Sequence, residues 1–315
     1  MSFQVKEPIL IVGLGGAGAK LAIQAREMLD AGTLIISNDQ ADFTANCDSI
    51  KISTGPVVNP TIQLIRGSTF NAIDEIKSKI SDYSTVILMA NMAGKSGSAI
   101  SPVVSSVCKE MHVGLVSFAV MPFKYEKERM FNAGISLKRV RADSDCTIVL
   151  DNDSLLESNP DLSPKQCYKI GNDAIMHVVN SLNRTEILQE TSILSTSKNQ
   201  DIEESLRDSL KMLYAEAPPS SVKCSILYVV GGENIPVGIL NSVSSLAKGV
   251  INEESQMETI SDINDEPKVV MLSAVQGMTK FDRYDPLGMI PLEQTLDWSE
   301  PECSIGCNLE LYQLE

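Results

Sequence analysis

The chain has 315 residues, 43% hydrophobic and 21% charged, a balance that allows a packed core and argues against wholesale disorder. The net charge of −15 argues against a nucleic-acid partner, because a surface that binds a phosphate backbone needs a lysine or arginine patch. No apolar run reaches the length of a membrane helix, and the N-terminal apolar stretch is too short for a signal peptide, so we expect a cytoplasmic protein without direct membrane insertion.

Cysteine and histidine usage argues against several enzyme classes. The seven cysteines are scattered and odd in number, which indicates reduced thiols. Cys303 and Cys307 lie four apart without a second pair or a histidine beside them, so we expect no zinc site. His112 and His177 are the only histidines, which argues against a Ser-His-Asp triad and against a catalytic metal held by several histidines.

Short apolar runs alternate with amphipathic segments through the first half of the chain. Strands that are apolar along their whole length belong to parallel sheets covered on both faces, so the pattern predicts an α/β fold with a Rossmann-like parallel sheet. The predicted strands are 8–12, 33–37, 85–90, 113–120 and 146–150. The predicted helices are 17–29, 61–80, 99–111, 126–142 and 164–182.

The composition changes after Leu182. Residues 183–200 are polar and predict a linker, and 201–214 predict a charged helix. A helix over 236–250 lies between strands 225–230 and 268–275. These segments predict a nucleotide-binding domain over 1–183, which includes the long central helix, a smaller α/β domain over 184–281, and an extended tail over 282–315.

A glycine-rich segment, GLGGAGAK, follows the first predicted strand and opens the first helix. Gly13, Gly15 and Gly18 satisfy GxGxxG, and such a turn aims backbone amides and a helix dipole at an anion. The fingerprint leaves three interpretations open. It fits a nucleotide phosphate site, a dinucleotide site with Asp39 at the ribose, or a turn that only lets helix and strand pack closely.

A second small-residue loop, AGKSGSA over residues 93–99, follows the strand at 85–90 and is followed by Pro-Val-Val at 102–104. A dehydrogenase does not require this second loop. The arrangement resembles the FtsZ/tubulin superfamily, whose GGGTGTG loop occupies the same place. The segments 121–130 (MPFKYEKERM), 145–156 (DCTIVLDNDSLL) and 167–173 (CYKIGND) resemble later motifs of that family in the same order.

The resemblance covers about residues 8–182 and is to a divergent, archaeal FtsZ-like protein. It implies a GTPase domain joined by the central helix to a smaller α/β domain. It also implies GTP or GDP as the bound nucleotide, possible Mg²⁺, head-to-tail self-assembly and a role in cell division. The nucleotide-binding residues it implies are Gly15, Gly16, Ala17, Gly18, Lys20, Gly94, Lys95, Ser96, Gly97, Ser98, Glu126, Arg129, Asn152, Tyr168 and Asn172.

Several of these positions also have a plain structural interpretation. Tyr168 can pack in a helix interface, Asn172 can cap or turn, and Glu126 with Arg129 can form a solvated ion pair. Departures from the family pattern add to the ambiguity. Ala93 and Ala99 replace glycines, at a cost of about 1 kcal/mol each if a positive φ is needed. Lys95 has no family counterpart, and its side chain either brings a cation to the phosphates or points to solvent. The family also has a glycine-rich loop that senses the γ-phosphate, and the matching segment here, TGPVVNP at 54–60, has a single glycine.

The catalytic segment is the weakest part of the resemblance. FtsZ inserts an Asn-x-Asp-x-x-Asp segment that follows the central helix into the site of the next subunit. Asn199, Asp201 and Glu204 fit this pattern with a glutamate in the last place, which makes Asp201 and Glu204 candidate catalytic residues. An alternative alignment makes 201–214 a later helix and implies that the catalytic loop is lost.

Three functions follow from these observations. The first is a GTP-binding protein that forms head-to-tail protofilaments, with hydrolysis weak or completed by the neighbouring subunit. The second is a non-hydrolysing scaffold or regulator of the same family. The third, which leaves the second loop unexplained, is an NAD-binding oxidoreductase using Gly13, Gly15, Gly18 and Asp39.

Overall fold

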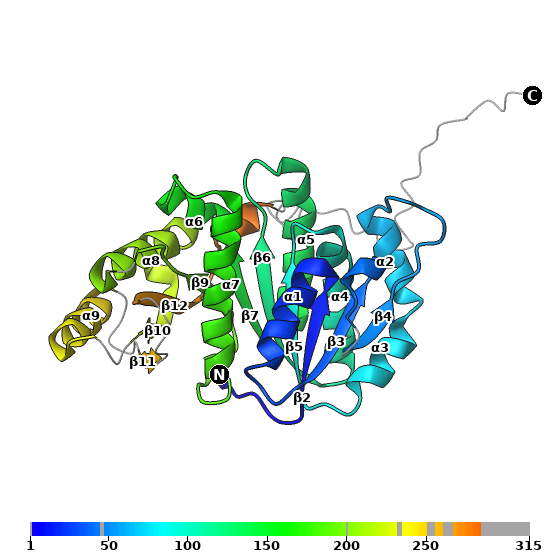
Figure 1. The fold of residues 1–315 in the computed structure, drawn as a ribbon, viewed down its shortest axis with the longest axis horizontal. Coiled ribbons are helices and arrows are strands. Elements are labelled where there is room, and N and C mark those ends of the chain that lie inside the picture. Colours follow the sequence, from blue (N-terminus) through cyan, green and yellow to red (C-terminus); the bar gives the residue numbers. More distant parts are fainter. Residues whose placement is uncertain are drawn as a thin grey trace, which may run out of the picture.

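The computed structural model shows a twisted sheet with helices packed on it (Figure 1). No helix in the described part of the chain is long and apolar enough to cross a membrane. The structure describes residues 2–44, 47–199, 201–231, 235–250, 256–260 and 267–284. The predicted tail from 285 onward, with Cys303 and Cys307, lies outside these residues.

The first half of the chain forms a parallel sheet in the order β7-β6-β5-β2-β3-β4. Nearly every residue of its central strands is buried, as expected for a sheet covered on both faces. The strands are β2 (Ile9–Leu14), β3 (Gly32–Ser37), β4 (Asp48–Lys51), β5 (Thr85–Asn91), β6 (Gly114–Met121) and β7 (Cys146–Asp151).

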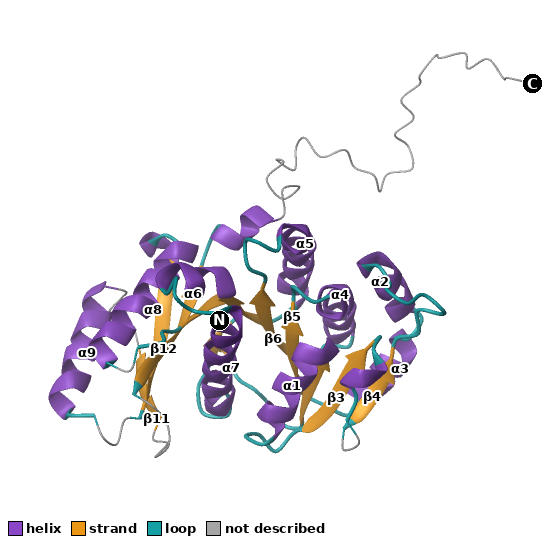
Figure 2. Ribbon diagram, turned by 45° about the horizontal axis from the view of Figure 1, so that its top comes forward, coloured by secondary structure: helices purple, strands orange, loops and turns teal. Residues whose placement is uncertain are grey.

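In the described residues of this half, seven α-helices accompany these strands. In Figure 2, α1 and α7 lie on one side of the sheet and α4 and α5 on the other. Alternate residues of β2 follow this division, because Leu10 and Val12 join the core under α4 while Ile9 and Ile11 join the core under α1 and α7. The helices are α1 (Gly15–Arg26), α2 (Ile62–Phe70), α3 (Ile73–Ile80), α4 (Lys95–Glu110), α5 (Lys127–Asp143), α6 (Asn152–Ser158) and α7 (Pro164–Ser181).

Among the residues that the structure describes, the second half adds four strands to the same sheet, in the order β9-β12-β10-β11. The join is made by β9, which pairs in parallel with β7 and antiparallel with β12. The sheet therefore continues across the predicted domain boundary at 183/184. The elements are β9 (Thr191–Ser195), α8 (Ile202–Glu216), β10 (Val222–Val230), α9 (Val237–Val250), β11 (Gln256–Ile260) and β12 (Lys268–Val275).

Three segments differ from the expectation drawn from sequence. The predicted linker 183–200 contains the buried strand β9 and the short β8 (Ile187–Leu188), which pairs with β1 (Ser2–Phe3). The predicted helix 61–80 is two helices, α2 and α3, separated at Asn71 and Ala72. The first residues of the predicted tail complete a 3-10 helix, η4 (Lys280–Tyr284).

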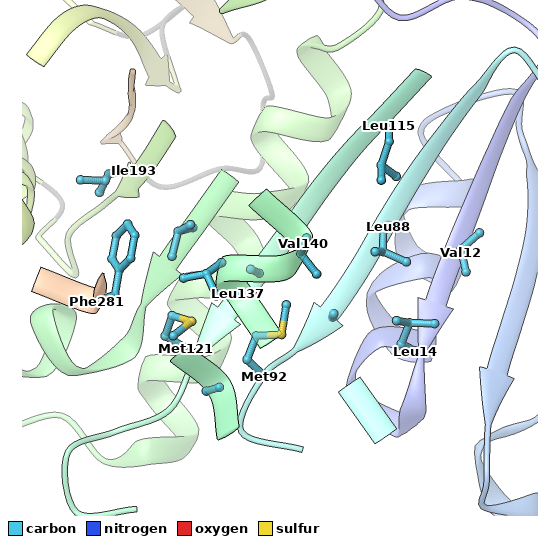
Figure 3. Close-up of a cluster of buried hydrophobic side chains, with 14 of the residues drawn as sticks. Val12, Leu14, Leu88, Met92, Leu115, Met121, Leu137, Val140, Ile193 and Phe281 are labelled. Carbon is cyan, nitrogen blue, oxygen red and sulfur yellow. The ribbon is translucent and has the colours of Figure 1, made fainter. Parts of the chain in front are cut away.

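Buried apolar side chains connect the two halves. Figure 3 shows Leu137 and Met121 from the first half in one cluster with Ile193 of β9 and Phe281 of η4. Phe281 is 1% exposed, and the guanidinium of Arg141 lies 5.5 Å from the centre of its ring. The end of the described chain therefore packs against α5, which belongs to the first half of the molecule.

Candidate functional site

The first glycine loop joins β2 to α1. A Cβ added at Gly18 would lie 2.3 Å from the carbonyl oxygen of Met89, and one at Gly13 would lie 2.6 Å from the carbonyl oxygen of Gly18. Gly15 has a φ of +64°, which disfavours other residues. Close packing of α1 on the sheet thus explains why Gly13 and Gly18 are glycines. The interpretation of the loop as a phosphate site therefore depends on residues 15–17.

The amides that open α1 are available to an anion. The helix begins at Gly15 after Leu14, which provides no side-chain cap, and its first turn has no acidic residue. Ala17 and Lys20 are exposed. Because the first N–H groups of a helix lack intrahelical partners and carry partial positive charge, this turn is suited to bind a phosphate.

The second loop opens α4 in the same way. Gly94 is the N-cap residue, no side chain caps the helix, and the first turn has no acidic residue. A Cβ at Gly97 would lie 2.1 Å from the carbonyl oxygen of Asn91, so glycine is required there by packing. Neither Ala93 nor Ala99 has a positive φ, so the alanines that replace family glycines carry no backbone strain of that kind.

Ser98 has an internal role. Its side chain is buried, its hydroxyl donates to the carbonyl oxygen of Met92, and its N–H donates to the carbonyl oxygen of Gly94 at 3.0 Å. Both of its donors are therefore occupied within the loop. The structure does not place Ser98 as a phosphate ligand, and the amides of residues 95–97 are the free donors of this turn.

The two loops meet at one edge of the sheet. β2 and β5 are parallel neighbours, so α1 and α4 begin side by side at their carboxyl ends. A Cβ at Gly15 would lie 2.9 Å from Cβ of Ser96. Two sets of unpaired helix N–H groups therefore converge on one place, as a polyphosphate would require.

Polar residues after β3 reach the same edge. Ser96 Oγ donates to Asn38 Oδ1 at 2.6 Å, and a Cβ at Gly16 would lie 2.6 Å from Asp42 Oδ1. Asp39 accepts the N–H of Ala41 at 2.9 Å as the cap of a 3-10 helix, η1 (Gln40–Asp42), and this local role accounts for it without a ribose. Sequence reasoning missed Asn38 and Asp42, although the end of a strand beside the glycine loop is a position from which ligands are bound in such sheets.

Lys95 is directed to the loop at 54–60. Its Nζ donates to Asn59 Oδ1 at 2.7 Å and to the carbonyl oxygen of Pro60 at 3.1 Å. Both acceptors are neutral, and in the described part of the chain no carboxylate forms an ion pair with this ammonium. Lys95 thus lies at the first residue of α4 with its charge unmatched, which is compatible with a phosphate nearby.

Aromatic side chains gather beside α7. The ring of Phe123 stacks on Tyr125 at 5.3 Å between centroids and meets Tyr168 edge-on at 5.5 Å. Tyr168 is half-buried, and burial raises the pKa of its hydroxyl, with a further contribution from Glu126. Glu126 Oε1 accepts from Arg129 Nη1 at 2.6 Å. The cluster therefore combines aromatic faces with an ion pair, and Tyr125 was not singled out from the sequence.

The two asparagines of the predicted site differ in exposure. Asn152 is 1% exposed; its Nδ2 donates to the carbonyl oxygen of Met121 at 3.0 Å, and its Oδ1 has no partner. Asn172 is half-buried and lies one helical turn after Tyr168 on α7. Asn172 is thus placed with Tyr168, whereas Asn152 ties the start of α6 to the end of β6 and is buried.

Comparison with known proteins gives a consistent result. The model of the Tubulin/FtsZ family, GTPase domain, matches residues 66–160. The FtsZ 1 cell division protein of Pyrococcus abyssi is 24% identical over 295 residues, which are 87% of this chain and 77% of that protein. The FtsZ dimer of M. jannaschii superimposes with a TM-score of 0.70 at 20% identity, over 87% of this chain and 89% of that one.

Residues 66–160 therefore match the tubulin/FtsZ family, and the chain as a whole is distantly similar to archaeal FtsZ proteins. The identities are low throughout. The CetZ2 protein of Haloferax volcanii, solved as a GTPgS-bound protofilament, has the same fold with a TM-score of 0.64 at 16% identity, over 89% of this chain and 98% of that one.

The connection between the central helix α7 and β9 is short. α7 ends at Ser181 and β9 begins at Thr191, and among residues 182–190 the structure has no helix. The Asn199 segment lies beyond β9, where Asp201 accepts the N–H of Glu204 at 3.0 Å as the N-cap of α8. Asp201 and Glu204 are exposed, but they do not lie in the loop that directly follows the central helix. This position agrees with the alternative alignment, in which 201–214 is a later helix.

Proposed function

We propose that this FtsZ-like protein binds a guanine nucleotide and assembles head to tail with copies of itself, and that it hydrolyses GTP slowly or not at all. A cytoplasmic location is part of the proposal. The observation that carries it is the convergence of the α1 and α4 N-termini, where Gly15 and Ser96 are in contact.

The amides of residues 15–17 and 95–97 would hold the phosphates of the nucleotide. Bound GTP supplies the phosphoanhydride that such proteins cleave, and these residues bind and orient it. Asp42, whose carboxylate lies against Gly16, offers an oxygen ligand for a magnesium ion that accompanies the nucleotide. The donors and the carboxylate present thus fit the charged part of a Mg-nucleotide.

The half-buried Tyr168 ring would stack on the base. Asn172, one turn further along α7, offers an amide that can donate and accept at once, as recognition of a guanine edge requires. Base stacking on an aromatic ring is worth about 1–3 kcal/mol by alanine substitution. This contact would supply base affinity that the phosphate loops alone cannot.

Weak hydrolysis is proposed from the course of the chain after α7. An acid that acts on a neighbour's nucleotide must lie on the loop presented to that neighbour, and Asp201 and Glu204 instead lie beyond β9. CetZ2 was solved as a GTPgS-bound protofilament, so a relative of this fold assembles around a nucleotide. We therefore favour assembly without rapid turnover.

The test combines nucleotide binding with sedimentation. Calorimetry with GTP, GDP and ATP should show guanine nucleotides binding and ATP binding more weakly, and GTP should move the protein into the pellet. Phosphate release per molecule should stay low at every protein concentration. Rapid release that rises with concentration would instead mean that a neighbouring subunit completes the site.

Two Tyr168 variants sharpen the test. Tyr168→Ala should weaken GTP binding roughly tenfold, while Tyr168→Phe, which keeps the ring, should bind as the wild type does. Equal affinities for both variants would reject the base-stacking assignment. Failure of the wild type to bind any guanine nucleotide would reject the proposal as a whole.

A further inference from the structure

The helix that opens at the second glycine loop contains a proline. Pro102 lies eight residues into α4 and has no N–H to donate. In a regular α-helix this N–H would bond to the carbonyl oxygen of residue 98. The carbonyl of Ser98, in the first turn of α4, is therefore deprived of its intrahelical donor.

Arg66 of α2 and Ser136 of α5 supply the missing donors. Arg66 Nη2 donates to the carbonyl oxygen of Ser98 at 3.0 Å, and Ser136 Oγ donates to the same oxygen at 2.7 Å. Arg66 Nε donates to the carbonyl oxygen of Ala99 at 3.4 Å, and Nη2 also reaches Ser136 Oγ at 3.1 Å. One guanidinium thus links α2 and α5 to the turn that presents the phosphate-binding amides.

The guanidinium of Arg66 is half-buried and lacks an acidic partner. Its hydrogen bonds go to neutral oxygens of Ser98, Ala99 and Ser136, and no carboxylate in the described residues forms an ion pair with it. Burial, and secondarily Arg139, lower its pKa, yet an arginine stays charged in proteins. A full positive charge is therefore fixed behind the first turn of α4 in a chain whose net charge is −15.

We propose that Arg66 is a positioning residue of the nucleotide site: it holds the first turn of α4 in place through the Ser98 and Ala99 carbonyls and adds its charge to the anion-binding end of that helix. The inference rests on the proposed function for its ligand, a nucleotide phosphate. Its structural part concerns the turn alone and can be tested without nucleotide.

The structural part is tested by hydrogen exchange on the nucleotide-free full chain. The Arg66→Gln, Ser136→Ala double variant leaves the Ser98 carbonyl without these donors, so exchange of the amides at 98–101 should accelerate roughly tenfold. Pro102→Ala restores an N–H four residues after Ser98. Adding it to the double variant should return exchange toward the wild-type rate, and no acceleration, or no rescue, would overturn the support role.

The ligand part is tested by GTP affinity with matched charge variants. Arg66→Gln should weaken GTP binding roughly tenfold. Arg66→Lys keeps the positive charge but lacks the planar set of guanidinium N–H donors, so it should recover part of the lost affinity. Arg139→Ala is the control, because it removes an exposed positive charge near Arg66 that, within the described residues, forms no hydrogen bond with α4. Equal losses in Arg139→Ala and Arg66→Gln would overturn the specific role of Arg66.

The two arms separate the possible failures. If the wild type binds no guanine nucleotide but exchange behaves as stated, the proposed function fails and the support of the turn stands. If GTP binds normally to every Arg66 variant while the exchange rates do not change, the inference fails and the proposed function stands.

Discussion

At the scale of single residues, glycines of the second loop are required to different degrees. Gly97 approaches the backbone of Asn91 so closely that a methyl group would overlap it, whereas a Cβ at Gly94 would meet only the carbonyl oxygen of Asn91 at 3.3 Å, with a φ of −81°. The family pattern alone makes the two positions equivalent. Their neighbours in the fold separate them.

We expect Gly97→Ala to lower the free energy of unfolding by about 1–3 kcal/mol, because backbone must shift to admit the methyl group. Gly94→Ala is the matched control and should cost less than about 1 kcal/mol. Urea denaturation of both variants measures the difference. Equal costs would show that the loop adapts to Gly97→Ala without strain.

The buried acidic residues Asp151 and Glu216 lead to a prediction about how stability depends on pH. Asp151 is 1% exposed; Tyr284 OH donates to its Oδ2 at 3.1 Å, and Glu216 lies beside it with Lys280 Nζ at 3.4 Å from Glu216 Oε1. Burial first, and then Glu216, raise the pKa of Asp151 well above its ordinary value of 3.8. The folded protein therefore keeps a proton that the unfolded chain loses.

This difference gives a sign to the pH dependence of stability. A raised carboxyl pKa contributes stability at low pH that is lost as the pH rises from about 4 through the folded-state pKa. Asp151→Asn cannot ionise, so its free energy of unfolding should fall less steeply over this window and should exceed that of the wild type at pH 7. Denaturant titrations between pH 4 and 8 measure both slopes.

The control for this prediction is Asp161→Asn. Asp161 is exposed and paired with Lys198, which lowers its pKa, so its removal should leave the slope above pH 4 unchanged. A wild-type stability that rises steadily from pH 4 to 8, with Asp151→Asn following it in parallel, would show that the buried proton is absent.

At the scale of elements, α8 shows how one segment can satisfy two sequence interpretations. Its first residues fit a catalytic pattern, and they also fit an N-cap followed by acidic residues that favour a helix start. In the fold Asp201 caps α8, and β9 comes between the central helix and this segment.

We expect Asp201→Ala to reduce the free energy of unfolding by about 1 kcal/mol through loss of the cap, while Asp201→Ser should retain most of it. Neither variant should change GTP turnover per molecule, and Glu204→Gln should change neither property. Parallel urea denaturation and phosphate-release assays measure the two effects. A turnover loss in both Asp201→Ser and Glu204→Gln would restore these residues as catalytic acids.

The elements of the first half were predictable because their signals are local. Apolar runs such as 85–90 and helix starts such as Ser163 before Pro164, where the structure has a capping box, need no distant partner. β9 carries no such signal, since TSILS is short and rich in hydroxyl side chains. It becomes a strand because β7 and β12 pair with it on both sides.

At the scale of the whole molecule, β9 unites the two halves in one sheet. Ile193 is 1% exposed and lies opposite Val149 of β7 and Ser273 of β12, in the same cluster as Phe281. Because this strand belongs to both halves, we expect the described part of the chain to unfold as one cooperative unit.

Ile193→Ala should lower the free energy of unfolding by about 2–4 kcal/mol while keeping a single transition by every probe. Val58→Ala, at a position 98% exposed, should change it by less than about 0.5 kcal/mol. Calorimetry with circular dichroism and intrinsic fluorescence measures this. Two separated transitions in the Ile193 variant would show that the halves fold independently.

The sequence by itself determined the parallel α/β half, the two glycine loops and the resemblance to the tubulin/FtsZ family, because strand, loop and helix signals there depend on neighbours a few residues away. Only the tertiary structure decided that residues 183–200 hold a strand and that Asp201 caps a helix beyond it. It also decided that Arg66 serves a carbonyl 32 residues distant. Such pairings are set by which surfaces the packed chain brings together, and a linear pattern does not carry that information.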